Sequence, residues 1–212
     1  MTEIWFIRHG ETDWNRQRRL QGWQDIPLNA AGLTQAQALA ERLRGESLPF
    51  DALYSSDLRR ALATAEPVGQ ALGLRVRPEP GIRERGFGVL EGLDLDRIDE
   101  LAPAAAAAWK SREPGRALDG GETLGQFHAR VVAAVEDIAQ RHAGQRLLAF
   151  THGGALDIIW RQASGVPLDA PRYASLLNVS INRVAVEGRA WRILDWGDVS
   201  HVADEVGNDI QP

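Results

Sequence analysis

Two histidines occupy the same sequence setting, at the end of an apolar run and directly before a glycine. His9 follows such a run in "EIWFIRHG", and His152 follows another in "RLLAFTHGG". Apolar runs of this length are typical of strands covered on both faces, and the carboxyl ends of parallel strands meet at one edge of a sheet. A single histidine at a strand end is more often structural, but two in one setting indicate a shared functional site.

Basic side chains accompany these histidines. Arg8 precedes His9, and in "YSSDLRRALATAEP" Arg59 and Arg60 fall in the first turn of a predicted helix that directly follows a strand. The positive end of the helix dipole lies there, so an arginine in that turn is electrostatically unfavourable. A bound phosphate would resolve the conflict, because helix N-termini and guanidinium groups both bind phosphate oxygens. The sequence therefore predicts an anion site.

A carboxylate lies in a third segment, the glycine-rich turn "IRERGFGVLEG", which contains Glu84. Next to two histidines and two arginines, this carboxylate can be an ion-pair partner or a general acid. The residues alone leave both interpretations open.

The strands that must position these side chains are predicted from short apolar runs. Residues 3–8, 52–55 and 146–151 have this pattern, and 179–186 with 190–196 indicate a hairpin around the turn "EGRA". Strands that alternate with helical segments are typical of an α/β fold with a parallel sheet. We expect the closing hairpin to add an antiparallel edge.

The helices are predicted from apolar residues at helical spacing. Segments 33–43, 58–72 and 122–142 each have one apolar face. Thr34 is the expected N-cap of the first helix and Asp57 of the second. Together with the strands, these helices predict a three-layer α/β/α sandwich.

Residues 80–121 differ from the rest of the chain, since prolines bracket the alanine-rich stretch "PAAAAAWKSREP". Alanine forms helices well but buries little surface, so a small surface helix is expected. The functional interpretation is a lid over a site at the carboxyl edge of the sheet. No linker separates two units, so we expect a single domain over residues 1–212 with a lid insertion at about 90–121.

The composition limits the classes of partner. The chain has 212 residues, a net charge of −5 and no cysteine. An acidic chain is unsuited to nucleic acid or an anionic membrane surface, and the lack of cysteine excludes thiolate chemistry. With no targeting segment and no apolar run of membrane-spanning length, we expect a cytoplasmic protein. A homodimer is compatible with the sequence.

Six motifs in one fixed order carry a resemblance to a known family. They are "RHGETDWN", "LQGWQDIPLNAAGLTQAQALA", "SSDLRRALATA", "RERGFGVLEG", "GGET" and "THGG". On these motifs the chain resembles the histidine phosphatase superfamily, in its phosphoglycerate mutase-like branch, over residues 3 to about 154, with "NVSINR" and the closing hairpin also fitting.

This resemblance implies a reaction. The histidine of the RHG motif attacks phosphorus and becomes phosphohistidine in the family, which assigns the nucleophile to His9. A neutral imidazole can do this near pH 7. Glu84 matches the family's proton donor to the leaving-group oxygen, which later draws a proton from water.

The resemblance also implies the phosphate clamp. Arg8 and His152 are the family's positions, together with the arginine of the third motif. Alignment of that motif assigns Arg60 and leaves Arg59 facing solvent. The planar guanidinium suits phosphate oxygens, and its charge makes a metal unnecessary, so neither a metal nor another cofactor is expected.

The remaining implied contacts surround the phosphate. Asn15 and the Gly153 backbone would donate to it, and Gln21 and Gly22 would line its site. Arg85, directly after the acid, could bind a substrate carboxylate. The expected partner is thus a small phosphorylated metabolite.

Two activities divide the family, and the sequence favours a phosphatase over a mutase. Gln21 and Gly22 stand where mutases usually have Thr-Gly, and the long mutase insertion after "FGVLEGL" is absent. Arg85 points the other way, because it matches the mutase pattern. A cofactor-dependent phosphoglycerate mutase therefore remains the alternative.

Two further classes are less favoured. A pseudo-enzyme would need neither the nucleophile His9 nor the acid Glu84, and both are intact. A hydrolase with a metal on His9, His152 and Glu84 would place a divalent cation beside two guanidiniums that repel it.

Overall fold

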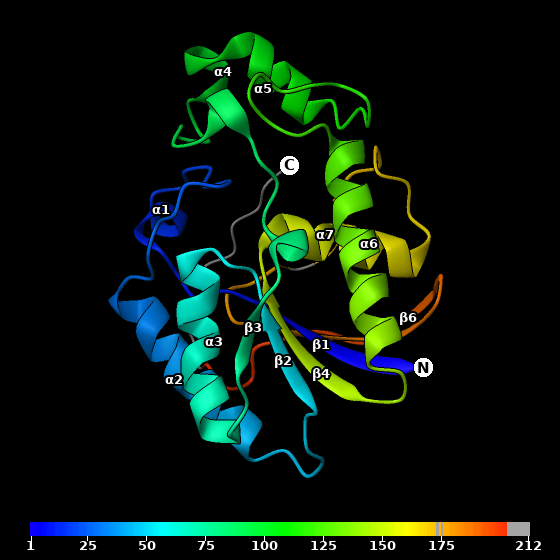
Figure 1. Ribbon diagram of the computed structural model, residues 1–212. Helices are drawn as coiled ribbons and strands as arrows, with labels where there is room; N and C mark the ends of the chain where they lie inside the picture. The colour runs from blue at the N-terminus through cyan, green and yellow to red at the C-terminus, as the bar shows by residue number, and fades with distance from the viewer. Residues whose placement is uncertain (173, 175, 203–212) are drawn as a thin grey trace.

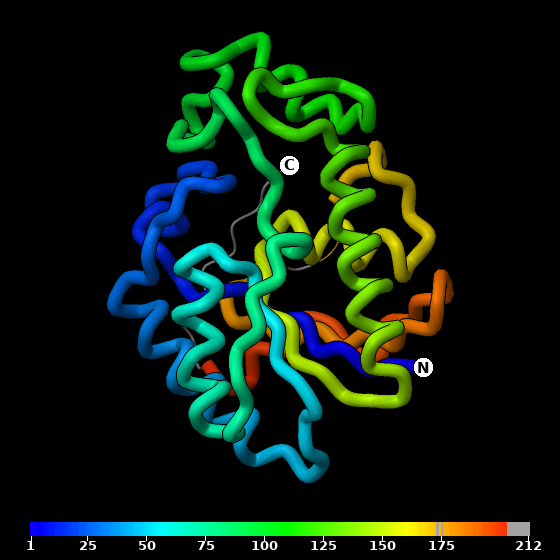
Figure 2. The backbone as a smooth tube through the Cα atoms, viewed as in Figure 1, coloured from blue at the N-terminus to red at the C-terminus, as the bar shows by residue number. Residues whose placement is uncertain are grey.

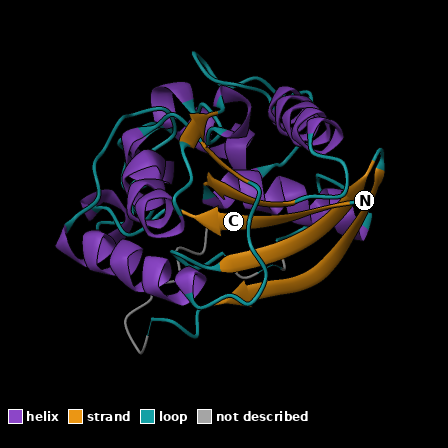
Figure 3. Ribbon diagram, turned by 60° about the horizontal axis from the view of Figure 1, so that its bottom comes forward, coloured by secondary structure: helices purple, strands orange, loops and turns teal. Residues whose placement is uncertain are grey.

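A six-stranded sheet forms the centre of the protein. The computed structural model describes residues 1–172, 174 and 176–202. The strands are β1 (Thr2–Arg8), β2 (Ala52–Ser55), β3 (Val76–Pro78), β4 (Arg146–Thr151), β5 (Ile181–Glu187) and β6 (Ala190–Asp198). They lie in the order β3-β2-β4-β1-β5-β6, and Figure 3 shows them side by side as one sheet. The first four strands of this order are parallel, and the β5–β6 hairpin is antiparallel.

Helices cover both faces of the sheet, because its strands are apolar on both sides. Ile4 and Phe6 of β1 face a cluster with the helices α6 (Leu124–Arg141) and α7 (Gly153–Ser164). Trp5 and Ile7 face the opposite cluster, with α2 (Ala30–Arg44) and α3 (Arg59–Leu72). Figure 1 shows these two helix pairs on opposite sides of the strands. The predicted three-layer α/β/α sandwich is confirmed.

The strand register brings the two histidine motifs to the same level. In the parallel β1–β4 pair, Arg8 lies beside Thr151, so His9 and His152 are the next residues of neighbouring strands. The His9 N–H donates to the Thr151 carbonyl at 2.9 Å. The two ring centroids are 5.1 Å apart. The expected meeting of both histidines at the carboxyl edge is confirmed.

Both predicted helix caps were wrong. The N-cap of α2 is Asn29, whose side chain accepts from the Gly32 N–H, and Thr34 lies inside the helix. The N-cap of α3 is Leu58, without a side-chain cap bond. Asp57 instead accepts from the Arg83 guanidinium. A local pattern does not reveal such a partner, which lies 26 residues further along the chain.

Two short elements also escaped the sequence patterns. Strand β3 is only three residues long and ends in proline, so it has no recognisable alternation. The helix α1 (Asp13–Arg16) is a single turn, closed by a capping box between Thr12 and Asn15. Strand β3 depends on its pairing with β2, whereas α1 is too short to show an apolar face in the sequence.

A small helical layer lies beyond the carboxyl edge of the sheet. It contains α4 (Ile98–Leu101) and α5 (Pro103–Lys110), preceded by the 3-10 turns η1 (Pro80–Ile82) and η2 (Gly88–Leu90). Figures 1 and 2 show α4 and α5 at the top of the view, apart from the sheet. The layer has its own apolar cluster, formed by Leu20, Phe87, Leu90, Ile98, Ala106, Trp109 and Leu118. Its function as a lid stays a prediction.

Over the described ranges, no helix is both long and apolar enough to cross a bilayer.

The cap of α2 gives a testable stability difference. Replacement Asn29→Ala removes the cap bond to Gly32 and the 2.7 Å bond that the Asn29 amide donates to Glu11. We expect a loss of about 1–2 kcal/mol in the free energy of unfolding, measured by urea denaturation. The control Thr34→Ala should change it by about 0.5 kcal/mol or less, because Thr34 is exposed within the helix. A larger loss for Thr34→Ala would contradict this cap assignment.

Candidate active site

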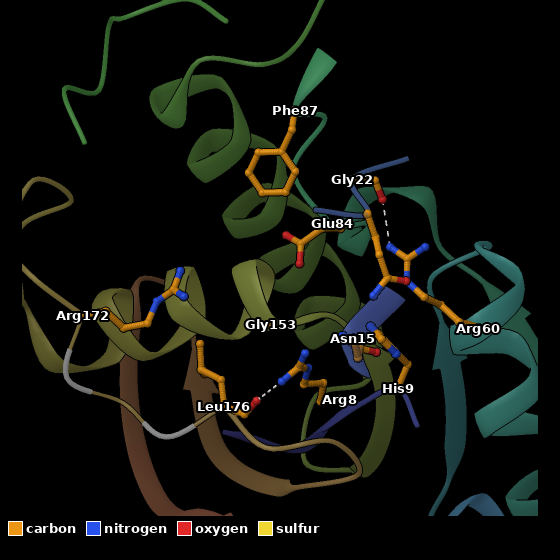
Figure 4. Close-up of a pocket in the computed structure, with 11 residues that line it drawn as sticks. Arg8, His9, Asn15, Gly22, Arg60, Glu84, Phe87, Gly153, Arg172 and Leu176 are labelled. Carbon is orange, nitrogen blue, oxygen red and sulfur yellow. Dashed lines mark hydrogen bonds between the residues drawn. The ribbon is translucent and has the colours of Figure 1, made fainter. Parts of the chain in front are cut away.

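A pocket of about 370 Å³ lies where the strand ends meet the helical layer. The side chains that line it come from segments spread over most of the chain. Figure 4 shows how they converge. The lining residues are Arg8, His9, Asn15, Gln21, Gly22, Arg60, Glu84, Phe87, Gly153, Arg172 and Leu176.

His9 is held as a neutral imidazole with one nitrogen available. Its Nδ1 lies 2.7 Å from the Gly10 carbonyl oxygen, which can only accept, so Nδ1 carries the proton. The lone pair is therefore on Nε2. Burial, followed by the positive charges of Arg60 and Arg8, holds the pKa of His9 well below its ordinary value. The arrangement suits a nucleophile, which needs an unprotonated nitrogen.

His152 lies directly beside His9 and is fully buried. Its Nε2 is 2.8 Å from the Ser56 hydroxyl, while Nδ1 has no hydrogen-bond partner within the described structure. Burial, Arg60 and His9 lower the pKa of His152 well below its ordinary value. An unpaired buried ring nitrogen is unusual, and a bound anion next to it would give it a partner.

Arg60 is the most buried charge of the pocket, with no exposed surface. Its Nη2 donates to the Gly22 carbonyl at 2.8 Å and its Nη1 to the Gln24 carbonyl at 2.9 Å. Burial lowers the pKa of Arg60 to about 10, so it stays protonated at neutral pH. Two carbonyls fix the guanidinium without cancelling its charge, which remains available to an anion.

Arg8 provides a second buried charge at the same edge, and Arg59 does not take part. The Arg8 Nη1 donates to the Leu176 carbonyl, which holds the side chain across the pocket floor. Arg59 is exposed, so the alignment that assigned Arg60 to the site and Arg59 to solvent agrees with their placement.

Glu84 faces the pocket from the side opposite to Arg8 and His9, as Figure 4 shows. Its Oε2 accepts from the Gly154 N–H at 2.9 Å and its Oε1 from the Arg85 N–H at 2.8 Å. Gly154 belongs to the first turn of α7, and a Cβ added there would lie 2.1 Å from the Glu84 Oε1. The glycine at position 154 therefore makes room for the carboxyl group.

Asn15, Gln21 and Gly22 lie in the pocket wall as expected. Asn15 is fixed by the capping box of α1, in which its Oδ1 accepts from the Thr12 N–H. Gly22 has a φ of +51°, and a Cβ there would lie 2.1 Å from the Glu91 carboxylate. Its carbonyl accepts from Arg60, so Gly22 contributes by orienting the clamp.

Arg85 is not part of this pocket. Its Nε and Nη2 donate to the Glu122 carbonyl at 3.0 and 2.8 Å, and burial lowers the pKa of Arg85 to about 10. It lines an adjoining pocket with Arg112, Asp157 and Arg172, and Phe87 and Arg172 line both. Binding of a carboxylate by Arg85 stays a prediction, and the second pocket is where it would occur.

Several residues of the site were not predicted from the sequence. Phe87, Arg172 and Leu176 line the pocket, and Ser56 contacts His152. Arg172 and Leu176 lie in a segment without helical or strand periodicity. Only Ser56, at the end of a predicted strand, could have been proposed from its position.

Within the part of the chain that the structure describes, no group of three or more histidine, aspartate and glutamate side chains is arranged to hold a metal ion.

Comparison with known proteins decides the family. The family model of the histidine phosphatase superfamily (branch 1) matches residues 4–199. The chain belongs to this superfamily.

This histidine phosphatase is similar to two curated proteins of Arabidopsis thaliana. It is 40% identical to the metal-independent phosphoserine phosphatase, over 96% of this chain and 84% of that protein. It is 37% identical to phosphoglycerate mutase-like protein 4, over 95% of this chain and 87% of that protein. Among solved structures, YhfR of Bacillus stearothermophilus matches with a TM-score of 0.84 and 35% identity, covering 95% of this chain and 99% of that one.

The protonation state of His9 in this histidine phosphatase can be measured. An ordinary histidine, with a pKa of about 6.5, is about three-quarters protonated at pH 6. Because the pKa of His9 is lowered, we expect NMR of ¹⁵N-labelled histidine to show a neutral Nδ1–H ring for His9 at pH 6. The spectrum of His9→Ala identifies the signal. Titration of that signal near pH 6.5 would contradict the buried, charge-repelled setting.

Arg60 and Arg59 form a matched pair for the phosphate clamp. Removal of a charged donor to an anion costs about 1.5–3 kcal/mol, so Arg60→Ala should weaken inorganic phosphate binding about 10- to 100-fold. Arg59→Ala should leave it within about twofold, because its side chain is exposed. Isothermal titration calorimetry measures both. Equal losses of phosphate affinity in the two variants would show that binding depends on general positive charge and not on Arg60 itself.

Proposed function

We propose that this protein is a metal-independent phosphomonoesterase that hydrolyses a small phosphorylated metabolite through a phosphohistidine on His9. The observation that carries the proposal is the position of the unprotonated His9 nitrogen. It lies in one pocket with two buried guanidiniums, and the Glu84 carboxyl group faces it across that pocket. Nucleophile, clamp and proton donor are thus all present in the pocket.

In the first step the His9 Nε2 attacks phosphorus. The new P–N bond forms as the P–O bond to the leaving group breaks, and a protonated Glu84 gives its proton to the departing oxygen. Arg8, Arg60 and His152 stabilise the negative charge on the phosphoryl oxygens. The Nδ1–H bond to the Gly10 carbonyl stabilises the cationic ring of the phosphohistidine.

In the second step water attacks the phosphohistidine. Glu84, now a carboxylate, accepts a proton from the water as the new P–O bond forms. The P–N bond breaks and its electron pair returns to the His9 Nε2. Release of phosphate restores the starting site, and one carboxyl group has acted as acid and then as base.

A phosphorylated carboxylic acid is the substrate class that we favour. The adjoining pocket combines Arg85, Arg112 and Arg172 with a single lining carboxylate, Asp157, and therefore has an excess of positive charge. The metal-independent phosphoserine phosphatase and the phosphoglycerate mutase-like relative both carry names that refer to phosphorylated carboxylic acids. Because such metabolites are charged and do not cross bilayers unaided, a cytoplasmic location is part of the proposal.

A phosphoglycerate mutase is the second candidate, and the mutase-like relative favours it. We rank hydrolysis first because of the Gln21–Gly22 pair and the short helical layer. In that layer α4 and α5 have only 4 and 8 residues. A mutase must retain the bisphosphorylated intermediate until it returns one phosphoryl group to the histidine, and it must exclude water meanwhile, which requires extensive closure over the site.

A panel of phosphomonoesters tests the proposal. We expect phosphate release from phosphoserine or 3-phosphoglycerate, unaffected by EDTA, and no formation of 2-phosphoglycerate even with 2,3-bisphosphoglycerate as primer. Mass spectrometry should detect one added phosphoryl group on the wild type during turnover and none on His9→Ala. Rapid isomerisation with little phosphate release would establish the mutase instead, and loss of activity with EDTA would exclude this mechanism.

A further inference from the structure

Trp23 contacts the proposed general acid although it does not line the pocket. Its indole Nε1–H donates to the Glu84 carbonyl oxygen at 2.8 Å. The ring lies against Gly86, and the Arg83 and Arg130 guanidiniums are 5.4 and 6.0 Å from its centroid. The residue is still 44% exposed, which is high for tryptophan. Burial of apolar surface therefore does not by itself explain why a tryptophan lies at position 23.

The backbone of Glu84 depends on such contacts because it lies outside regular structure. Residues 83–87 belong to no helix or strand. The Glu84 carbonyl accepts from Trp23 and from the Arg130 Nη2, the latter at 3.0 Å. These two donors restrain the backbone from which the catalytic carboxyl group extends.

The loop that carries Trp23 also holds the phosphate clamp. Arg60 donates to the carbonyls of Gly22 and Gln24, the residues on either side of Trp23. Figure 4 shows the bond between Arg60 and Gly22. Consecutive residues therefore contact the guanidinium that binds phosphate and the backbone of the acid that protonates the leaving group.

Glu91 fixes the conformation of this loop by accepting hydrogen bonds from it. Its Oε1 accepts from the Trp23 N–H at 3.0 Å and from the Phe87 N–H at 3.0 Å, and its Oε2 accepts from the Gln24 Nε2 at 3.1 Å. The carboxylate thus ties residues 23–24 to the segment that follows Glu84. A displacement of Arg60 would therefore be transmitted through these hydrogen bonds to the backbone of Glu84.

We propose that Trp23 is a positioning residue that couples the phosphate clamp to the general acid, through its indole bond to the Glu84 carbonyl and the bonds of its neighbours to Arg60. Binding of an oxyanion at Arg60 then sets the loop, and the loop sets the distance between the Glu84 carboxyl group and the leaving-group oxygen. The role of Trp23 in catalysis rests on the proposed function. The link between Arg60 and Trp23 does not depend on that function.

Leaving-group dependence tests the catalytic role. Trp23→Phe keeps an aromatic ring but removes the N–H. It should lower kcat/KM for an alkyl phosphate about tenfold more than for p-nitrophenyl phosphate, whose leaving oxygen needs little protonation. Glu84→Gln should show the same selectivity with a larger ratio, about 10²-fold or more. Partial unfolding would lower kcat/KM equally for both substrates. The ratio of the two kcat/KM values therefore separates positioning from a merely structural effect.

Trp14→Phe is the matched control. Trp14 is half-buried on α1, and its ring lies against Gly92. This variant should keep the wild-type ratio between the two substrates. An unchanged ratio in Trp23→Phe, or an equal shift in both variants, would overturn the positioning role.

Fluorescence with orthovanadate as the oxyanion tests the link itself. We expect vanadate to change tryptophan emission in the wild type and in Trp14→Phe, and the change to be lost in Trp23→Phe and in Arg60→Ala. A change that persists in Trp23→Phe would overturn the coupling. This measurement needs no turnover, so a protein inactive on every phosphomonoester would refute the proposed function while the coupling could still be confirmed or refuted.

Discussion

The whole site depends on how the protein keeps a fully buried guanidinium charged and available. Arg60 has no exposed surface, and a buried charge without compensation is strongly unfavourable. Carbonyl oxygens of Gly22 and Gln24 solvate the group, whereas a directly bonded carboxylate would have neutralised it. The positive charge therefore remains for a substrate. This arrangement requires the loop to point two carbonyls inward, which is possible because Gly22 adopts a left-handed conformation.

The same charge determines the state of the histidines. A buried imidazole beside two guanidiniums is more stable without a proton, so the His9 ring has the lone pair that a nucleophile needs. The Gly10 carbonyl selects the tautomer and leaves Nε2 available. A phosphate dianion would bring negative charge into a pocket where Arg8, Arg60 and Arg172 outnumber the single carboxyl group of Glu84, and substrate binding thus relieves an electrostatic imbalance.

The acid is placed by a different part of the fold. Glu84 comes from an irregular segment, and its carboxyl group is held by the N-terminus of α7, through Gly154. Its backbone is held by Trp23 and Arg130, which belong to a loop and to α6. The clamp and the acid therefore come from independent elements, and the loop around Trp23 contacts both. The second pocket, with Arg112 and Arg172 both paired to Asp157, continues from this side of the site.

The sequence by itself determined five of the six strands and the helices α2, α3 and α6, because each depends on local signals. Apolar runs predict buried strands, and histidines that end two such runs must meet if the strands are parallel neighbours. The motif order then assigned His9, Arg60 and Glu84. Only the tertiary structure decided the caps of α2 and α3, the separation of Arg85 from the phosphate pocket, and the contacts of Trp23 and Arg130 with Glu84. The physical reason is that each of these depends on a partner distant in the chain, such as Arg83 for Asp57, and no local pattern records which distant groups will meet.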